Sequence, residues 1–158
     1  MNIKQKIWTE DDFDIMSWHD SKVYGIGFDE ENFKLLLDID YIIDWVKPEP
    51  NNIYFSFWVS PATLVFTNVY DLNIEISTTL GIDICKVFRE KPIVPINKEY
   101  INKDTEWLWR ISSNQGDITF RSIGYKQYIR RKPILTDGQN IPLIERAGIS
   151  FAEECYPD

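Results

Sequence analysis

The sequence predicts a mainly β protein, in which antiparallel meandering hairpins form a sandwich or a partly open barrel. Apolar and polar residues alternate with a period of two along several stretches, which is typical of half-buried strands. Aromatic residues make up 15% of the 158 residues, and large aromatic side chains suit the packed faces of sheets. The length fits a single domain spanning residues 1–158.

The clearest hairpin lies near the N-terminus. In "VYGIGF" (23–28) the even positions are large and apolar, and in "NFKLLLDIDY" (32–41) the odd positions are apolar. The polar tetrapeptide "DEEN" (29–32) has the length of a hairpin loop. Pairing of Phe28 with Phe33 would place Asp38 and Asp40 on the polar face, away from the main core.

Other segments follow the same pattern. "IYFSFWV" (53–59) is nearly all apolar, which favours a central strand, and Pro61 is expected to end it. Two prolines exclude a continuous helix in 78–105, which we expect to be mostly a connection with one short element before Pro92. Thr9 is expected to cap one helical turn. The turn that Thr9 caps is expected at 10–16. Strands are expected at 63–76, 106–111, 117–129 and 141–144, with a bulge or an edge between 120 and 123.

Charge and cysteine content narrow the function classes. The net charge of −8 argues against nucleic acid as a partner, because phosphate binding needs a basic surface. Residues 1–50 carry twelve acids and five bases, which favours a basic protein partner. The sequence has no apolar run of membrane-spanning length. Sparse cysteine usage fits a reducing cytoplasm, although a disulfide between Cys85 and Cys155 stays open.

His19 is the only histidine, so histidine-dependent chemistry must use it. In the expected register His19 lies diagonal to Asp40, and Asp38 lies on the same face. One interpretation is a small metal-dependent hydrolase centred on these three residues. The other, which we favour, is a fold-defining hairpin whose aspartates are solvated. No cofactor-binding motif is present, and no cofactor is expected.

The segment "EWLWR" (106–110) places Trp107 and Trp109 on one face of a strand and Arg110 on the other. Core packing is the simpler interpretation. The alternative is an interface, in a homodimer or structural module, in which tryptophan and arginine act as anchors.

The segments "WHDSKVYGIGFDEENFKLLLDIDYI" and "FWVSPATLVFTNVYDLNIEI" resemble a group of small bacterial β proteins, some of which are classed as Imm50-like immunity proteins. The resemblance covers roughly residues 13–76 and supplies no catalytic residues. It implies a cytoplasmic protein that neutralises a toxin by binding it. The sequence therefore favours a non-enzymatic binding protein with an acidic surface, and the candidate binding residues are His19, Asp20, Asp38, Asp40, Trp107, Trp109 and Arg110.

Overall fold

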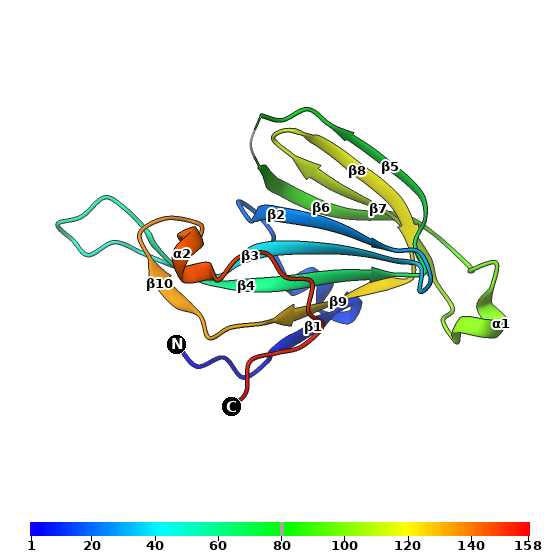
Figure 1. The fold of residues 1–158 in the computed structure, drawn as a ribbon, viewed down its shortest axis with the longest axis horizontal. Coiled ribbons are helices and arrows are strands. Elements are labelled where there is room, and N and C mark those ends of the chain that lie inside the picture. Colours follow the sequence, from blue (N-terminus) through cyan, green and yellow to red (C-terminus); the bar gives the residue numbers. More distant parts are fainter. Residues whose placement is uncertain (80) are drawn as a thin grey trace.

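The computed structural model describes residues 1–79 and 81–158, and it confirms the mainly β antiparallel class (Figure 1). The described residues form ten strands and three short helices. The strands are β1 (Ile7–Thr9), β2 (Lys22–Asp29), β3 (Lys34–Val46), β4 (Ser56–Thr67), β5 (Tyr70–Ile76), β6 (Ile82–Ile93), β7 (Glu106–Ser113), β8 (Gly116–Ser122), β9 (Gly124–Ile129) and β10 (Ile134–Thr136). The helices are the 3-10 helix η1 (Glu10–Ile15), α1 (Lys98–Ile101) and α2 (Leu143–Arg146).

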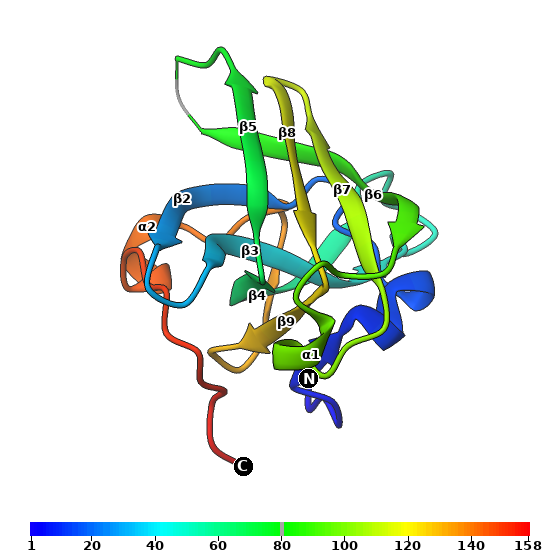
Figure 2. The ribbon, with the colours of Figure 1, turned by 90° about the vertical axis from the view of Figure 1, so that its right-hand side faces the viewer.

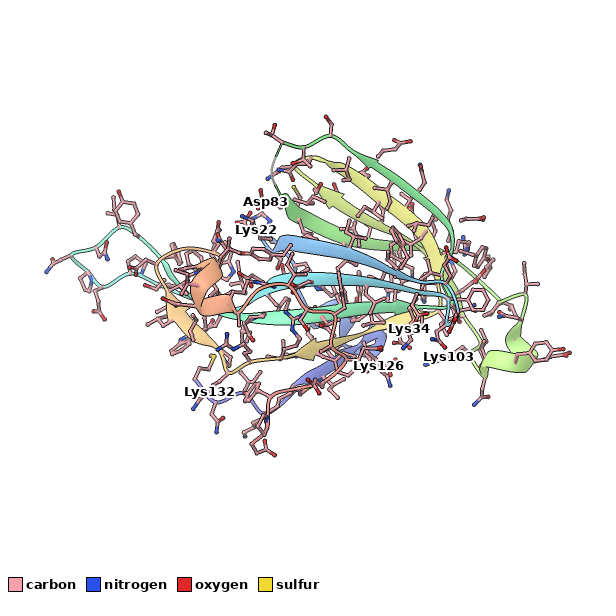
Figure 3. The ribbon with its side chains drawn as sticks, viewed as in Figure 1. Lys22, Lys34, Asp83, Lys103, Lys126 and Lys132 are labelled. Atoms are coloured by element: carbon pink, nitrogen blue, oxygen red, sulfur yellow. The ribbon has the colours of Figure 1, made fainter. Side chains whose placement is uncertain are left out.

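The strands form one open, folded sheet in the order β1-β9-β4-β3-β2-β6-β7-β8-β5, with β10 beside β4. Its two halves meet where Lys22 pairs with Asp83 and Val23 pairs with Ile82. Figure 3 shows Lys22 and Asp83 close together at this junction. Beyond it, the half made of β5 to β8 crosses over the half that contains β2 and β3 (Figure 2).

The main core lies between the two halves of the sheet. Phe66 of β4 is fully buried and meets Trp109 of β7 edge-on at 5.2 Å between ring centroids. Phe120 of β8 approaches the Phe66 ring at 4.7 Å. Edge-to-face aromatic pairs at these separations add to the stabilisation that comes from burial alone. This aromatic contact explains how two sheet halves joined by a short ladder hold together.

The expected helical turn after Thr9 is present as η1. The Thr9 amide donates to Asp12 at 2.8 Å, and the Thr9 hydroxyl accepts from the Asp11 amide at 3.3 Å. This reciprocal cap satisfies donors that a helix start leaves free.

The N-terminal hairpin forms, but the expected register is wrong. Phe28 pairs with Leu35, and a bulge follows between Val23 and Gly25. The bulge turns Tyr24 to the face that carries Asp38 and Asp40, since an extra residue reverses the alternation of side chains. That face is not solvated, because the C-terminal segment covers it: Phe151 and Ile149 lie against Gly25.

Pro61 does not end the strand that contains it. β4 continues to Thr67, with β10 pairing up to Val59 and β9 pairing from Ala62. Pro61 falls between these two partners and its carbonyl accepts from the Arg130 amide at 3.0 Å. A missing N–H is tolerated at such a gap in the ladder.

Two other segments also differ from expectation. Residues 82–93 form the long strand β6 rather than a connection. Register shifts at 84–86 and 90–93 break the period-two pattern, which concealed this strand in the sequence. Residues 143–146 form α2 rather than a strand. The short apolar run at 141–144 does not by itself distinguish a strand from a short helix. Residues 117–129 do not form one strand: β8 ends at Ser122 and β9 begins at Gly124, so the shift near residue 123 marks a break between two strands rather than a bulge.

Candidate partner-binding groove

Asp38 and Asp40 are fully buried, so the expectation that they solvate an outer face was wrong. Arg146 donates from Nε to Asp40 Oδ1 and from Nη1 to Asp38 Oδ2, each at 2.8 Å. Arg130 donates to Asp38 at 2.6 Å, and the Ser150 amide donates to Asp38 at 2.9 Å. Opposite charges and hydrogen bonds therefore hold both carboxylates in the interior.

Asp40 also accepts from the Ile141 amide at 2.7 Å and from the Tyr24 hydroxyl at 3.1 Å. The Arg146 guanidinium lies 3.8 Å from the centre of the Tyr24 ring. Burial alone would lower the pKa of Arg146, but its hydrogen bonds to Asp38 and Asp40 and their charge attraction together outweigh burial and raise the pKa. The cluster thus joins the C-terminal segment to β3.

His19 does not join this carboxylate cluster. Its Nδ1 lies 3.2 Å from the carbonyl oxygen of Cys85, and its Nε2 lies 3.4 Å from Asp20 Oδ2. Its ring stacks on Trp45 with centroids 6.1 Å apart. Among residues 1–79 and 81–158, no three His, Cys, Asp or Glu side chains are grouped so as to hold a metal ion. The geometry gives the metal-dependent hydrolase no support.

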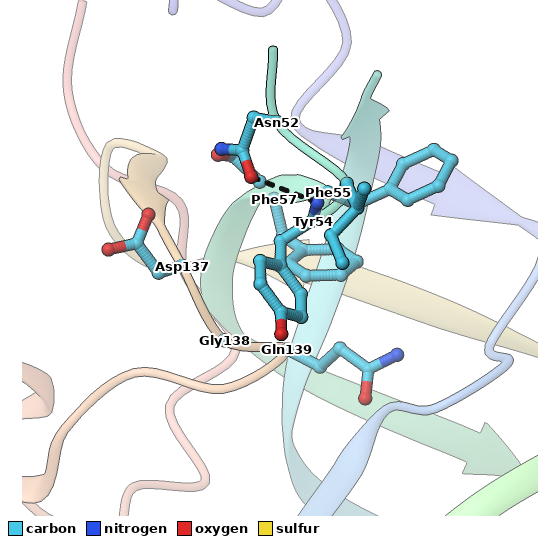
Figure 4. A pocket seen from close by; sticks show the side chains of 9 residues that line it. Asn52, Tyr54, Phe55, Phe57, Asp137, Gly138 and Gln139 are labelled. Atoms are coloured by element: carbon cyan, nitrogen blue, oxygen red, sulfur yellow. Dashed lines mark hydrogen bonds between the residues drawn. The ribbon is translucent and has the colours of Figure 1, made fainter. Parts of the chain in front are cut away.

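An aromatic pocket lies between the β3–β4 loop and the turn after β10 (Figure 4). Its volume is about 590 Å³. Tyr54 and Phe57 lie on one wall, with Asp137 on the other. Gln139, also on its lining, donates to Asp20 at 2.6 Å. The pocket offers aromatic faces and one carboxylate, which suit an apolar or cationic group.

Trp107 and Trp109 share the inward face of β7, as expected, but neither is an exposed anchor. Trp109 is fully buried and donates to the Ser122 carbonyl at 3.0 Å. Trp107 is half-buried, and the Arg89 guanidinium covers it at 4.7 Å from the centre of the Trp107 ring. Arg110, on the outer face, lies 4.1 Å from the centre of the Phe88 ring. The structure places the tryptophan pair in the core.

A second surface that combines exposed aromatic rings with negative charge, here from several carboxylates, is a groove at the opposite end of the sheet. We define the groove by Phe28, Asp29, Glu30, Phe33, Asp71 and Leu72, which lie on its walls. Its volume is about 340 Å³. Phe28 and Phe33 are 61% and 63% exposed. Contiguous exposed apolar surface with a polar rim often marks an interaction site.

Two carboxylates of the groove, Glu30 and Asp71, are exposed, whereas Asp29 is held by Asn32. The Asn32 side chain and amide donate to Asp29 at 2.9 and 3.2 Å, and these bonds lower the pKa of Asp29. Lys34, labelled in Figure 3, also lies on the groove wall, but Glu153 holds its Nζ at 2.9 and 3.0 Å. The groove is therefore negative as well as apolar.

The backbone around the groove adopts uncommon conformations. Phe33, Asn68 and Asp71 have φ of 55°, 53° and 52°, a region that a bulky side chain such as phenylalanine rarely enters. The Val69 amide donates to the Phe33 carbonyl at 2.9 Å, which links the two turns that form the groove. Such strain persists where surrounding structure enforces it and is concentrated at functional sites.

Sequence reasoning missed the groove, since it placed Phe28 and Phe33 among the core-facing residues. The rings lie at the hairpin end, beyond the part of the core that would cover them. The sequence signal that could have indicated the groove is the pair Phe28 and Phe33 on either side of the acidic turn 29–32. Comparisons of the chain with protein-family models, curated proteins and solved structures returned no match.

Proposed function

We propose that the protein is a non-enzymatic binding protein that holds a basic, apolar segment of a protein partner in the groove. The observation that carries this proposal is the position of two exposed phenylalanine rings beside the carboxylates of Asp29, Glu30 and Asp71. Aromatic side chains supply much of the binding energy at protein interfaces. Carboxylates around them attract a basic partner and accelerate association.

The partner class that we propose is a basic bacterial toxin, with neutralisation in the cytoplasm. The resemblance of residues 13–76 to immunity proteins supports this class, and so does the net charge of −8. Both cysteines are free thiols, which is compatible with a reducing compartment. Among the described residues, no helix is both long and apolar enough to cross a bilayer.

Peptide display tests the proposal on the isolated protein, whatever the identity of the partner. Random linear peptides are selected on the immobilised protein, and the bound pool is then measured on three proteins: wild type, Phe33→Asn and Tyr54→Ser. We expect enrichment of lysine, arginine and large apolar residues, with binding lost in Phe33→Asn and kept in Tyr54→Ser.

Tyr54→Ser is a matched control because it removes an exposed aromatic ring from the pocket of Figure 4. If Tyr54→Ser loses binding while Phe33→Asn keeps it, the peptides bind in the aromatic pocket, and the groove is not the binding site. Enrichment of acidic peptides would refute the proposed partner chemistry.

A further inference from the structure

The strand that forms one wall of the groove is also a free sheet edge. β5 is the last strand of the sheet and pairs with β8. In the described part of the chain, no strand pairs with its other side. Figure 2 shows that open side running down toward the hairpin of β2 and β3. An unpaired edge presents a row of N–H and C=O groups to any extended chain of suitable chemistry.

The register of β5 identifies the backbone groups that face outward. The Ser77 amide donates to the Gln115 carbonyl at 3.0 Å, directly beyond the pairs Ile76 with Gly116 and Glu75 with Asp117. Since backbone direction alternates along a strand, Glu75 points its N–H and C=O toward β8. Ile76, and Ile74 two residues before it, then point theirs toward the open side.

The side chains of β5 leave apolar surface for an added strand to cover. Leu72 and Ile76 pack against the main core, and Ile74 on the same face remains 39% exposed. Leu72 is also part of the groove wall, so the groove and the open edge are continuous. A segment that pairs with the edge would place alternate side chains beside Ile74 and extend toward the two exposed phenylalanine rings.

The charge of the edge favours a basic segment over a second copy of this chain. β5 has the sequence "YDLNIEI", with two acids, no lysine, no arginine and no proline. Asp71 and Glu75 are exposed. Two such edges placed side by side would bring like charges together, whereas lysine or arginine opposite Glu75 would be favourable.

We propose that the partner segment binds by strand addition: it pairs with the open edge of β5, its apolar side chains continue into the groove, and its basic side chains face Asp71 and Glu75. This inference rests on the proposed function and specifies its binding mode. The alternative occupants are an amphipathic helix laid into the groove and a second copy of the chain.

Hydrogen exchange of the full-length protein tests the proposed mode, using a peptide obtained from the display selection. We expect the peptide to slow exchange of the Ile74 and Ile76 amides by about tenfold or more, because each gains a hydrogen-bond partner. The Asn73 and Glu75 amides already point toward β8 and should change less. Equal slowing at all four positions, or no slowing, would overturn strand addition.

Backbone methylation of the peptide gives a second, independent test. N-methylation of every second residue should abolish binding in one frame and spare it in the other, because a strand turns alternate amides toward its neighbour. A helix loses binding in both frames, and that result would contradict strand addition while leaving the groove as the site.

Two further results distinguish failure of the proposed function from failure of strand addition alone. If no selected peptide binds, or binding is unaffected in Phe33→Asn, the proposed function fails and strand addition fails with it. If Ile74 and Ile76 are already protected without peptide and the protein sediments as a dimer, the edge belongs to a second copy. Glu75→Lys should weaken peptide binding about tenfold, whereas Glu90→Lys, at an exposed site on β6, should not.

Discussion

Arg146 lies fully buried against Asp40, donating from Nε at 2.8 Å, although the two residues are 106 positions apart in the chain. The same guanidinium bonds to Asp38 on the same face of β3. This contact fixes the C-terminal segment on the outer face of the sheet, where sequence reasoning expected solvent. It therefore makes the two aspartates structural residues.

Arg146→Ala should lower the free energy of unfolding by about 3–5 kcal/mol, because it leaves buried carboxylates without their main counter-ion. Urea unfolding followed by tryptophan fluorescence measures the loss. Lys132→Ala, at an exposed site, is the control and should change little. A loss below about 1 kcal/mol in Arg146→Ala, comparable to a surface ion pair, would show that the cluster does not hold the segment.

Gly25→Ala should loosen the C-terminal segment. A Cβ at residue 25 would lie 3.0 Å from Phe151 Cζ and 3.1 Å from Ile149 Cγ2, so these side chains must shift. We expect a cost of about 1–3 kcal/mol and faster trypsin cleavage after Arg146. Gly27→Ala is the matched control, since its Cβ would meet Phe151 at 3.4 Å. Equal cleavage rates in both variants would contradict the packing described.

Stability should fall as the pH rises from about 10 toward 12. Burial is the main cause that raises the pKa of Tyr24, Tyr41 and Tyr70 from 10.0 to about 12. For Tyr24 and Tyr70, nearby Asp40 and Glu106 raise it further. The folded state thus keeps protons that the unfolded state releases above pH 10, and stability is lost through that window. Absorbance at alkaline pH follows the phenolates; if these three ionise near pH 10 with the protein still folded, the prediction is wrong.

Phe33→Asn should abolish peptide binding without loss of stability. Asparagine tolerates the positive φ of 55° at residue 33 better than phenylalanine does, so unfolding free energy should stay within about 1 kcal/mol of wild type or rise. Phe33→Val removes the ring but keeps the strain, and should be less stable than Phe33→Asn. Thermal melts compare the two variants, and a lower stability for Asn than for Val would mean that the backbone at residue 33 is not strained.

The sequence predicted the fold class because alternation of apolar and polar residues is a local signal. The same reasoning failed for features that depend on contacts between segments distant in the sequence. The bulge beside Tyr24 shifted the register of the first hairpin, and Pro61 was tolerated because it falls between two neighbouring strands. Arg146 could not be assigned to Asp38 and Asp40, since nothing in the sequence indicates which arginine reaches them. Exposure of Phe28 and Phe33 depends on where the core ends, which is a property of the assembled sheet.

Salt dependence of peptide binding tests the central claim, that exposed aromatic rings and free carboxylates act together in the groove. Calorimetry measures the Kd of a selected peptide between about 0.05 M and 0.5 M NaCl for wild type and for Glu30→Gln. We predict that wild-type binding weakens about tenfold across this range, and that Glu30→Gln reduces both the affinity and its salt dependence. A Kd that is unchanged by salt and by Glu30→Gln would contradict the account.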